Sequence, residues 1–109
     1  MSRLTTEIWV AAYLTRCRLA TIPAFIVQKG DATAGAVIIK LNTLDGRAIS
    51  FQRSFDLMTG ARKWVVLVEG GEPEVDASIA SQRGFDPDLW VIEIEDKEGR
   101  HLLDEPGLE

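Results

Sequence analysis

The fold is decided by one stretch of the sequence, Ala36-Val-Ile-Ile-Lys-Leu-Asn-Thr-Leu-Asp-Gly-Arg-Ala-Ile-Ser-Phe-Gln-Arg53. Apolar and polar side chains alternate on both sides of Asp45-Gly46, and such a period of two is typical of strands. Aspartate followed by glycine is typical of a tight turn. The stretch therefore predicts two strands, Ala36–Thr43 and Arg47–Arg53, joined as a hairpin.

The length of the turn decides which residues of the hairpin face each other. A two-residue turn would set Leu41 opposite Ser50, so that apolar and polar side chains would share a face. A three-residue loop shifts the pairing by one residue and makes one face apolar, which is worth roughly 1.5–3 kcal/mol for each side chain buried. We therefore predict the three-residue loop, with positive φ at Gly46. The predicted pairs are Leu41 with Ile49, Ile39 with Phe51, Asn42 with Ala48 and Lys40 with Ser50.

The rest of the chain predicts further helices and strands around this hairpin. Thr5 or Thr6 can cap a first helix that runs to about Ala20, because a threonine hydroxyl accepts a backbone N–H at a helix start. A strand that is apolar on both faces is typical of the centre of a sheet, and Lys63–Glu69 has this pattern. The other predicted elements are strands at Ala24–Lys29 and Leu89–Glu95, a second helix at about Glu74–Arg83, and a short returning strand at Arg100–Leu103.

The order of these elements is α-β-β-β-β-α-β. Short turns between consecutive strands favour an α+β fold, with a mainly antiparallel sheet of about five strands and both helices packed on one face. We expect residues 1–109 to form a single domain, with residues 104–109 as a loose tail. Gly30–Gly35 is predicted to be a hairpin loop, because a phosphate-binding loop needs a following Lys-Ser/Thr and a helix, whereas Ala36-Val37 and a strand follow here.

Charge and composition narrow the class of protein. The net charge is −5, which argues against a general binder of nucleic acid or of an anionic membrane. Residues 1–53 hold seven Lys/Arg and three Asp/Glu, whereas residues 54–109 hold five and fourteen. This asymmetry marks either a partner surface or two halves whose strands interleave in one sheet. One cysteine, no long apolar run and an acid at Glu7 predict a soluble cytoplasmic protein.

The first helix carries apolar residues on two sides. Val10, Tyr13, Leu14 and Cys17 follow the spacing of a buried helix face. A second side is also apolar, and one small sheet cannot cover both, so we expect it to contact another copy of the chain. Closed two-fold dimers are the commonest form of self-association. The predicted interaction surface consists of Ile8, Trp9, Ala12 and Leu19.

Candidate polar sites are few. Glu93 and Glu95 lie on one side of the predicted last strand, and His101 follows nearby, but tight metal sites need more histidine, cysteine or converging acidic segments. The sequence contains no Gly-x-Ser-x-Gly elbow for a hydrolase. Cys17 fits a small buried hydrophobe better than a nucleophile. We therefore predict no catalytic, cofactor-binding or metal-binding residue.

Three segments together resemble a known family. They are Glu7–Leu14, Gly30–Gly46 and Asp86–Asp96 with Gly99-Arg100, and the last is the most specific. The chain resembles small bacterial proteins grouped as domain of unknown function 1491. The resemblance implies a bacterial cytoplasmic protein and implies no catalytic residue, cofactor or substrate.

These observations favour a non-enzymatic binding or protein-interaction module that forms a homodimer and binds neither nucleic acid nor membrane. The alternative is a small-molecule-binding or enzymatic domain with a pocket between the sheet and the first helix. In that alternative Arg16, Arg18 and the acidic strand would supply the polar groups. A convergent polar pocket would favour the alternative, and a flat apolar patch would favour the interaction module.

Overall fold

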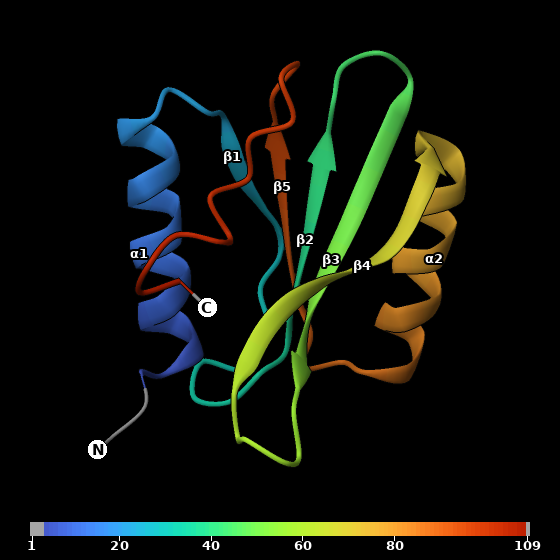
Figure 1. Cartoon of the computed structure of the whole chain (residues 1–109). Helices are drawn as coiled ribbons and strands as arrows, with labels where there is room; N and C mark the ends of the chain where they lie inside the picture. Colours follow the sequence, from blue (N-terminus) through green and yellow to red (C-terminus); the bar gives the residue numbers. More distant parts are fainter. Residues whose placement is uncertain (1–3, 109) are drawn as a thin grey trace.

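A computed structural model describes residues 4–108 of the chain. Two helices flank a twisted five-stranded sheet (Figure 1), and the α+β class and the order of elements are as predicted. Thr5 caps the first helix, since its Oγ1 accepts a hydrogen bond from the Ile8 N–H at 3.4 Å. The elements are α1 (Thr6–Leu19), β1 (Ala24–Gln28), β2 (Val37–Asn42), β3 (Arg47–Phe55), β4 (Arg62–Gly71), α2 (Glu72–Phe85) and β5 (Trp90–Glu95).

The sheet is mixed rather than mainly antiparallel. Its strand order is β1-β5-β2-β3-β4, so the last strand in sequence lies between the first two. β5 pairs in parallel with β2 and antiparallel with β1. The prediction of a hairpin loop at Gly30–Gly35 is therefore wrong, because β5 separates the strands that this loop connects. Residues 100–103 form no strand.

The β2–β3 hairpin has the predicted register. Leu41 lies opposite Ile49 and Ile39 lies opposite Phe51, and the other two predicted pairs are also present. The loop comprises Leu44-Asp45-Gly46, and Gly46 has a φ of 87°. The need to bury one apolar face of the hairpin therefore decides that its turn is a three-residue loop.

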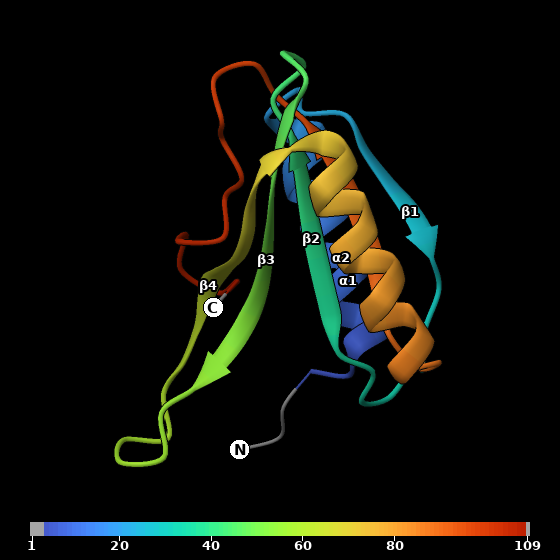
Figure 2. The same cartoon turned by 90° about the vertical axis from the view of Figure 1, so that its right-hand side faces the viewer.

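The two helices lie on opposite faces of the sheet (Figure 1), so that α2 stands in front of α1 when the molecule is turned by 90° (Figure 2). The prediction that both helices pack on one face is therefore wrong. In β2, Ile39 packs with residues of α1, whereas its neighbour Ile38 packs with residues of α2. In β5, Ile92 likewise packs in the core on the α1 side, whereas its neighbour Val91 packs in the core on the α2 side. Successive side chains of a strand point to opposite faces, so strands that are apolar on both faces need cover on both.

The C-terminal segment lies over the α1 face and is not a loose tail. Leu108 is 1% exposed, and its carbonyl accepts hydrogen bonds from the indole N–H groups of Trp9, at 3.3 Å, and Trp64, at 2.8 Å. Tyr13 Oη donates to the His101 carbonyl at 2.8 Å. Buried polar groups need such partners, and the segment supplies them. The prediction of a loose tail is therefore wrong for residues 104–108, and residue 109 lies outside the described residues.

β4 is an edge strand, although its apolar pattern predicts a central one. Trp64 packs against the α1-side core, while Leu67 and Val68 pack against the α2-side core. Both faces of β4 are thus partly covered without a strand on its outer side. Strands of the basic and acidic halves alternate in the sheet, since β5 lies between β1 and β2, so the charges of the two halves mix within one sheet.

Candidate functional site

Strand β1 is the most apolar open edge of the sheet. Phe25, Ile26 and Val27 are consecutive and are 51%, 46% and 51% exposed. Phe25 lies opposite Glu93 and Ile26 lies opposite Ile92, so these two side chains lie on opposite faces of the sheet, with Val27 at an irregularity in the pairing. β1 pairs with β5 on one side only, because it is the first strand in the order. Its other side presents backbone hydrogen-bonding groups beside exposed apolar side chains.

The predicted interaction surface on α1 is split by the structure. Ile8 and Leu19 are 53% and 77% exposed, and Ala12 is also exposed. Trp9 instead lies in the core at 5% exposed, with its ring stacked on Tyr13 at a centroid distance of 5.1 Å. Trp9 is therefore removed from the predicted surface, while the other three residues form an exposed stripe.

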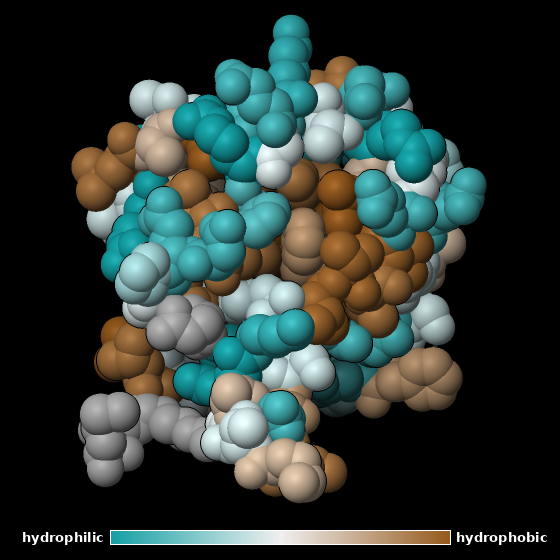
Figure 3. All heavy atoms as spheres, viewed as in Figure 1, coloured by the Kyte–Doolittle hydropathy of each residue, from teal (hydrophilic) through white to brown (hydrophobic). Residues whose placement is uncertain are grey.

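A second exposed apolar area lies at the β4 edge of the sheet, where Figure 3 shows apolar atoms gathered right of centre. Val66 of β4 lies opposite Phe51 of the α1-side core and is 52% exposed. Its neighbours Leu67 and Val68 pack against the α2-side core.

The predicted polar residues do not converge on one site. Arg16 lies on α1 and pairs with Glu105 at 3.3 Å, and its other terminal nitrogen donates to the Pro106 carbonyl. Arg18 is exposed beside the start of β1. Glu93 lies on the opposite, α2-side face of the sheet, where it contacts Lys40, and Glu95 lies two residues further along the same strand. The proposed combination of these arginines with the acidic strand is therefore not formed.

His101 and Cys17 have structural surroundings. His101 Nδ1 accepts a hydrogen bond from the Leu103 N–H at 3.0 Å, and its ring lies 4.8 Å from that of Phe51. Cys17 is fully buried, and this burial raises the pKa of its thiol above the usual value. A thiol held in its protonated form is a poor nucleophile.

A buried lysine collects three carboxylates on the α2 side. Lys40 Nζ lies 2.6 Å from Asp76, 2.7 Å from Glu72 and 3.3 Å from Glu93. The Asn42 amide also donates to Glu72, at 3.1 Å. Burial alone would lower the pKa of Lys40, but the hydrogen bonds to Asp76 and Glu72 and the charge of Glu93 raise it well above its usual value. Lysine thus occupies the cation position itself, and within residues 4–108 no group of three or more His, Cys, Asp or Glu side chains is arranged to hold a metal.

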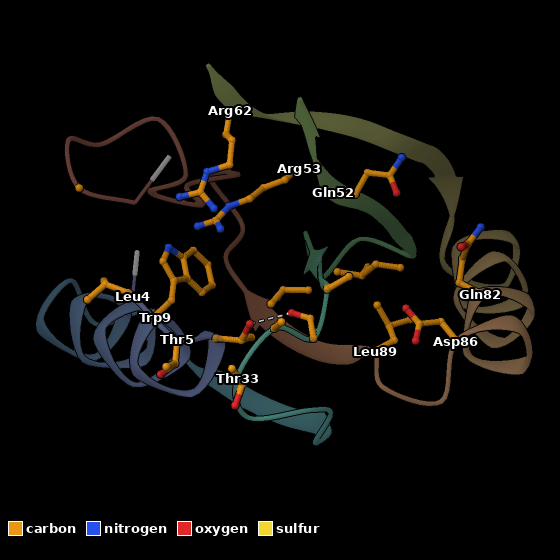
Figure 4. Close-up of a pocket in the computed structure, with 17 residues that line it drawn as sticks. Leu4, Thr5, Trp9, Thr33, Gln52, Arg53, Arg62, Gln82, Asp86 and Leu89 are labelled. Carbon is orange, nitrogen blue, oxygen red and sulfur yellow. Dashed lines mark hydrogen bonds between the residues drawn. The ribbon is translucent and has the colours of Figure 1, made fainter. Parts of the chain in front are cut away.

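A pocket of about 720 Å³ opens between α1, the sheet and the end of α2. Figure 4 shows Arg53 and Arg62 directed toward each other near Trp9, with Gln82 and Asp86 on the opposite wall. The lining residues are Leu4, Thr5, Thr6, Trp9, Thr33, Ala34, Gly35, Ala36, Val37, Ile38, Gln52, Arg53, Arg62, Gln82, Asp86, Leu89 and Gly107.

Comparisons with known proteins identify the family. The family model described as protein of unknown function (DUF1491) matches residues 4–104. The chain belongs to the DUF1491 family. No curated protein matches it. Within residues 4–108, neither helix has the length and apolar character needed to cross a membrane.

Solved structures include members of the DUF1491 family. The crystal structure of a DUF1491 family protein from Caulobacter crescentus CB15 has a TM-score of 0.86 at 42% identity, over 95% of this chain and 98% of that one. An NMR structure of a DUF1491 family protein from the same organism has a TM-score of 0.83 at 42% identity, over 97% of each chain. The solution structure of protein Atu0922 from A. tumefaciens has a TM-score of 0.73 at 28% identity, over 86% of each chain.

Two segments that carry the DUF1491 resemblance lie against each other. The Asp31 N–H donates to the Asp88 carbonyl at 3.0 Å, and the Trp90 indole N–H donates to the Asp31 carbonyl at 2.7 Å. A Cβ on Gly30 would lie 2.1 Å from the Asp88 carbonyl oxygen, and one on Gly35 would lie 2.5 Å from it. These glycines therefore permit the close approach of the loop before β2 and the loop before β5. Both loops contribute residues to the lining of the pocket.

The sequence patterns missed Arg53 and Arg62 as candidate site residues in this DUF1491 chain. Both lie at the β3–β4 end of the sheet, and Arg53 lies directly opposite Trp64. The signal that could have found them is a pair of cations beside aromatic residues in the half-buried ends of two strands. The alternation of apolar and polar residues along a strand, taken alone, predicts that such arginines lie on a solvent-exposed face of the sheet.

Proposed function

We propose that this protein is a non-enzymatic interaction module of the bacterial cytoplasm, which forms a homodimer by antiparallel pairing of β1 with β1 of a second copy. The observation that supports this function best is the run of exposed apolar residues Phe25–Val27 on an open edge. A helix or loop laid on one face would cover only part of the run. An added strand covers both faces, because its own side chains alternate between them.

The sequence of β1 favours a second copy as the added strand. Antiparallel pairing centred on Ile26 sets that residue opposite its counterpart and sets Phe25 opposite the partner's Val27. Apolar side chains then meet apolar side chains across the two-fold axis, as a closed dimer requires.

Charge at the ends of β1 also fits a second copy. The same register brings the partner's Lys29 beside Pro23, whose carbonyl accepts the Glu95 N–H at 3.0 Å. The Lys29 side chain is largely exposed, with only a loose contact of 3.9 Å to Glu7. The partner's Lys29 and Glu95 would therefore lie on either side of Pro23 at each end of the paired strands, and such charge complementarity fixes register more than it adds affinity.

The test is the molar mass of the purified protein by light scattering at tens of micromolar. We expect a dimer for the wild type and a monomer for Ile26→Lys, because a charge at the centre of the paired edge must lose its water. Leu57→Lys is the matched control, since Leu57 is more exposed than Ile26 and lies in the distant β3–β4 loop. This control should remain dimeric.

The exposed stripe of Ile8, Ala12 and Leu19 is the competing surface in this test. Dissociation by Ile8→Lys, with Ile26→Lys still dimeric, would move the interface from β1 to α1. A wild-type monomer at these concentrations would overturn the proposed function altogether. Circular dichroism of each variant separates loss of association from loss of folding.

A further inference from the structure

One side of α1 carries a stripe of four residues that faces away from the C-terminal segment. The stripe consists of Glu7, Ala11, Leu14 and Arg18, which recur every three or four residues and therefore lie on one side of the helix. Three of them are exposed and Leu14 is half-buried. Arg16, which pairs with Glu105 of the C-terminal segment, points about 160° away from Arg18, because a helix turns through 3.6 residues. The C-terminal segment thus covers the side of α1 opposite the stripe.

The two charged ends of the stripe lie at the two ends of β1. Lys29, directly after β1, has its Nζ 3.9 Å from Oε2 of Glu7. Arg18 lines a hollow together with residues 21–24, at the start of β1. Glu7 and Arg18 are separated by about 16 Å of helix, and the chain from Pro23 to Lys29 spans about 20 Å. The stripe and the strand therefore run side by side over similar lengths, in opposite directions.

The proposed pairing of β1 with its counterpart places both copies of α1 on the same face of the joined sheet. Antiparallel strands that set Ile26 opposite its counterpart are related by a two-fold axis perpendicular to the sheet. This axis makes the two α1 helices antiparallel to each other. Since the partner's Lys29 lies beside Pro23 in this register, the partner's Glu7 comes to the end of β1 at which Arg18 lies. The symmetry repeats this approach at the other end.

The space between the two helices suits long side chains. α1 packs with Ile39 of β2 and Ile92 of β5, so it stands back from the edge strand. Ile26 lies opposite Ile92 and therefore points to the α1 face, yet it is 46% exposed. The partner's strand lies about 4.8 Å beyond β1, so Ile26 and its counterpart form the floor of a groove between the helices. Arginine and glutamate side chains are long enough to meet across such a groove.

We propose that the dimer has a second contact, in which Glu7 of each copy forms an ion pair with Arg18 of the other copy across this groove. The inference rests on the proposed β1 pairing, and it states what selects a second copy over any other strand. Backbone pairing along an edge accepts many sequences. An ion pair at each end of the groove accepts only a partner with the opposite charges in the same order. Glu7 then lies between its own Lys29 and the partner's Arg18.

Glu7 and Arg18 also have a local role, which the experiment has to separate from the contact between copies. Glu7 lies in the first turn of α1 and Arg18 lies in the last, where their charges favour the helix dipole. In this local role two charge reversals have additive effects, because each acts on its own end of the helix. In the contact between copies, the second reversal instead repairs the first.

The experiment measures the dimer dissociation constant by analytical ultracentrifugation for the wild type, Glu7→Arg, Arg18→Glu and the double variant. Each single reversal should weaken the dimer at least about tenfold, because symmetry turns two attractions into two repulsions. The double variant should return to within about threefold of the wild type, since both ion pairs are restored with their signs exchanged. Glu7→Arg/Arg83→Glu is the matched control. It restores the same net charge through the last turn of α2, on the other face, and should remain as weak as Glu7→Arg alone.

Failure of this inference and failure of the β1 dimer give different results. Unchanged dimers in all the reversal variants, with Ile26→Lys monomeric, would overturn the ion pairs and leave the β1 interface unaffected. Losses of affinity that add in the double variant would assign both charges to the helix ends alone and also overturn the inference. A monomeric wild type would overturn the inference together with the proposed function.

Neutral variants keep the test decisive if a charge reversal unfolds the chain, which circular dichroism reports. Added salt screens exposed ion pairs, so it should weaken the wild-type dimer. Glu7→Gln and Arg18→Gln should each reduce this weakening, compared with Arg83→Gln. The same salt dependence in all three neutral variants would contradict the proposed ion pairs.

Discussion

The two faces of the sheet are each covered by one helix, yet their interiors differ in chemistry. On the α1 side the core holds Trp9, Tyr13 and Trp90, and each has its polar group bonded to a backbone carbonyl. On the α2 side a smaller apolar cluster adjoins Lys40 and its three carboxylates. The C-terminal segment closes the α1 side, whereas the rim of the α2 side stays open to water.

This difference shows how a small protein can accommodate a buried charge. The Lys40 side chain is 6% exposed, but those of Glu72 and Asp76 are 34% and 53% exposed. Carboxylates at an open rim keep much of their hydration, so the desolvation cost of an ion pair is reduced. On the α1 side, the buried polar groups of Trp9, Tyr13 and Trp90 are neutral donors to backbone carbonyls, so these three contacts carry no ionic desolvation cost.

The largest expected effect on the free energy of unfolding comes from truncating a core residue of β2, and the adjacent residue, which faces the other side of the sheet, provides the comparison. Truncation of Ile39, in the sealed core, should cost near the upper end of the about 2–5 kcal/mol that is usual for isoleucine to alanine. Ile38→Ala should cost near the lower end, because Ile38 lines the pocket, where water can enter the space that is left. Urea denaturation of both variants measures the difference. Equal costs would mean that the two faces are equally sealed.

A smaller effect is expected from Lys40→Met. We predict a loss of about 1–3 kcal/mol at neutral pH, less than for a fully buried pair, because the three carboxylates lose a shared cation but retain contact with water. Lys29→Met is the matched control, since Lys29 makes only one long, exposed contact, and it should change the stability by less than about 0.5 kcal/mol. A neutral result for Lys40→Met would mean that the lysine contributes no net stability.

The pH dependence sharpens the same measurement. The folded state raises the pKa of Lys40 above its usual value, so its contribution is fully present below about pH 10.4 and is lost as the pH rises through the folded pKa. The stability gap between wild type and Lys40→Met should therefore narrow above that pH. Burial also raises the pKa of Tyr13, but Tyr13 is present in both proteins and its alkaline destabilisation cancels in the difference.

The smallest expected effect on stability concerns the β2–β3 turn, whose length sets which residues of the hairpin lie on each face of the sheet. Gly46→Val should cost about 1–2 kcal/mol, because a side chain is strained at positive φ. A Cβ added there meets nothing within 4 Å, so the cost is one of backbone conformation alone. Gly84→Ala, at an equally open position within α2, should instead stabilise by up to about 1 kcal/mol. Thermal unfolding of both variants reports the sign.

The sequence predicted what depends on neighbouring residues and missed what depends on distant ones. The register of Leu41 with Ile49 follows from local alternation, and the Thr5 cap follows from local chemistry. The insertion of β5 between β1 and β2 leaves no local pattern, although Val91-Ile92 is apolar on both faces and could have indicated a central strand. The anchoring of Leu108 by two tryptophans joins residues far apart in the chain. Arg53 and Arg62 are near each other in one hairpin, but the contact of Arg53 with Trp9 of α1 also joins residues far apart in the chain.

The position of β5 also governs the order in which the fold can assemble. During synthesis β1 and β2 are complete long before Trp90–Glu95 exists, yet they are not hydrogen-bonded to each other. Until the last strand arrives, β1 has no neighbour in the sheet and the β2–β3–β4 meander has an unpaired side. Pairing over such sequence separations is entropically costly and slow. The protein therefore closes its sheet in one late step, and a chain that ends before Trp90 lacks the strand that joins its two parts.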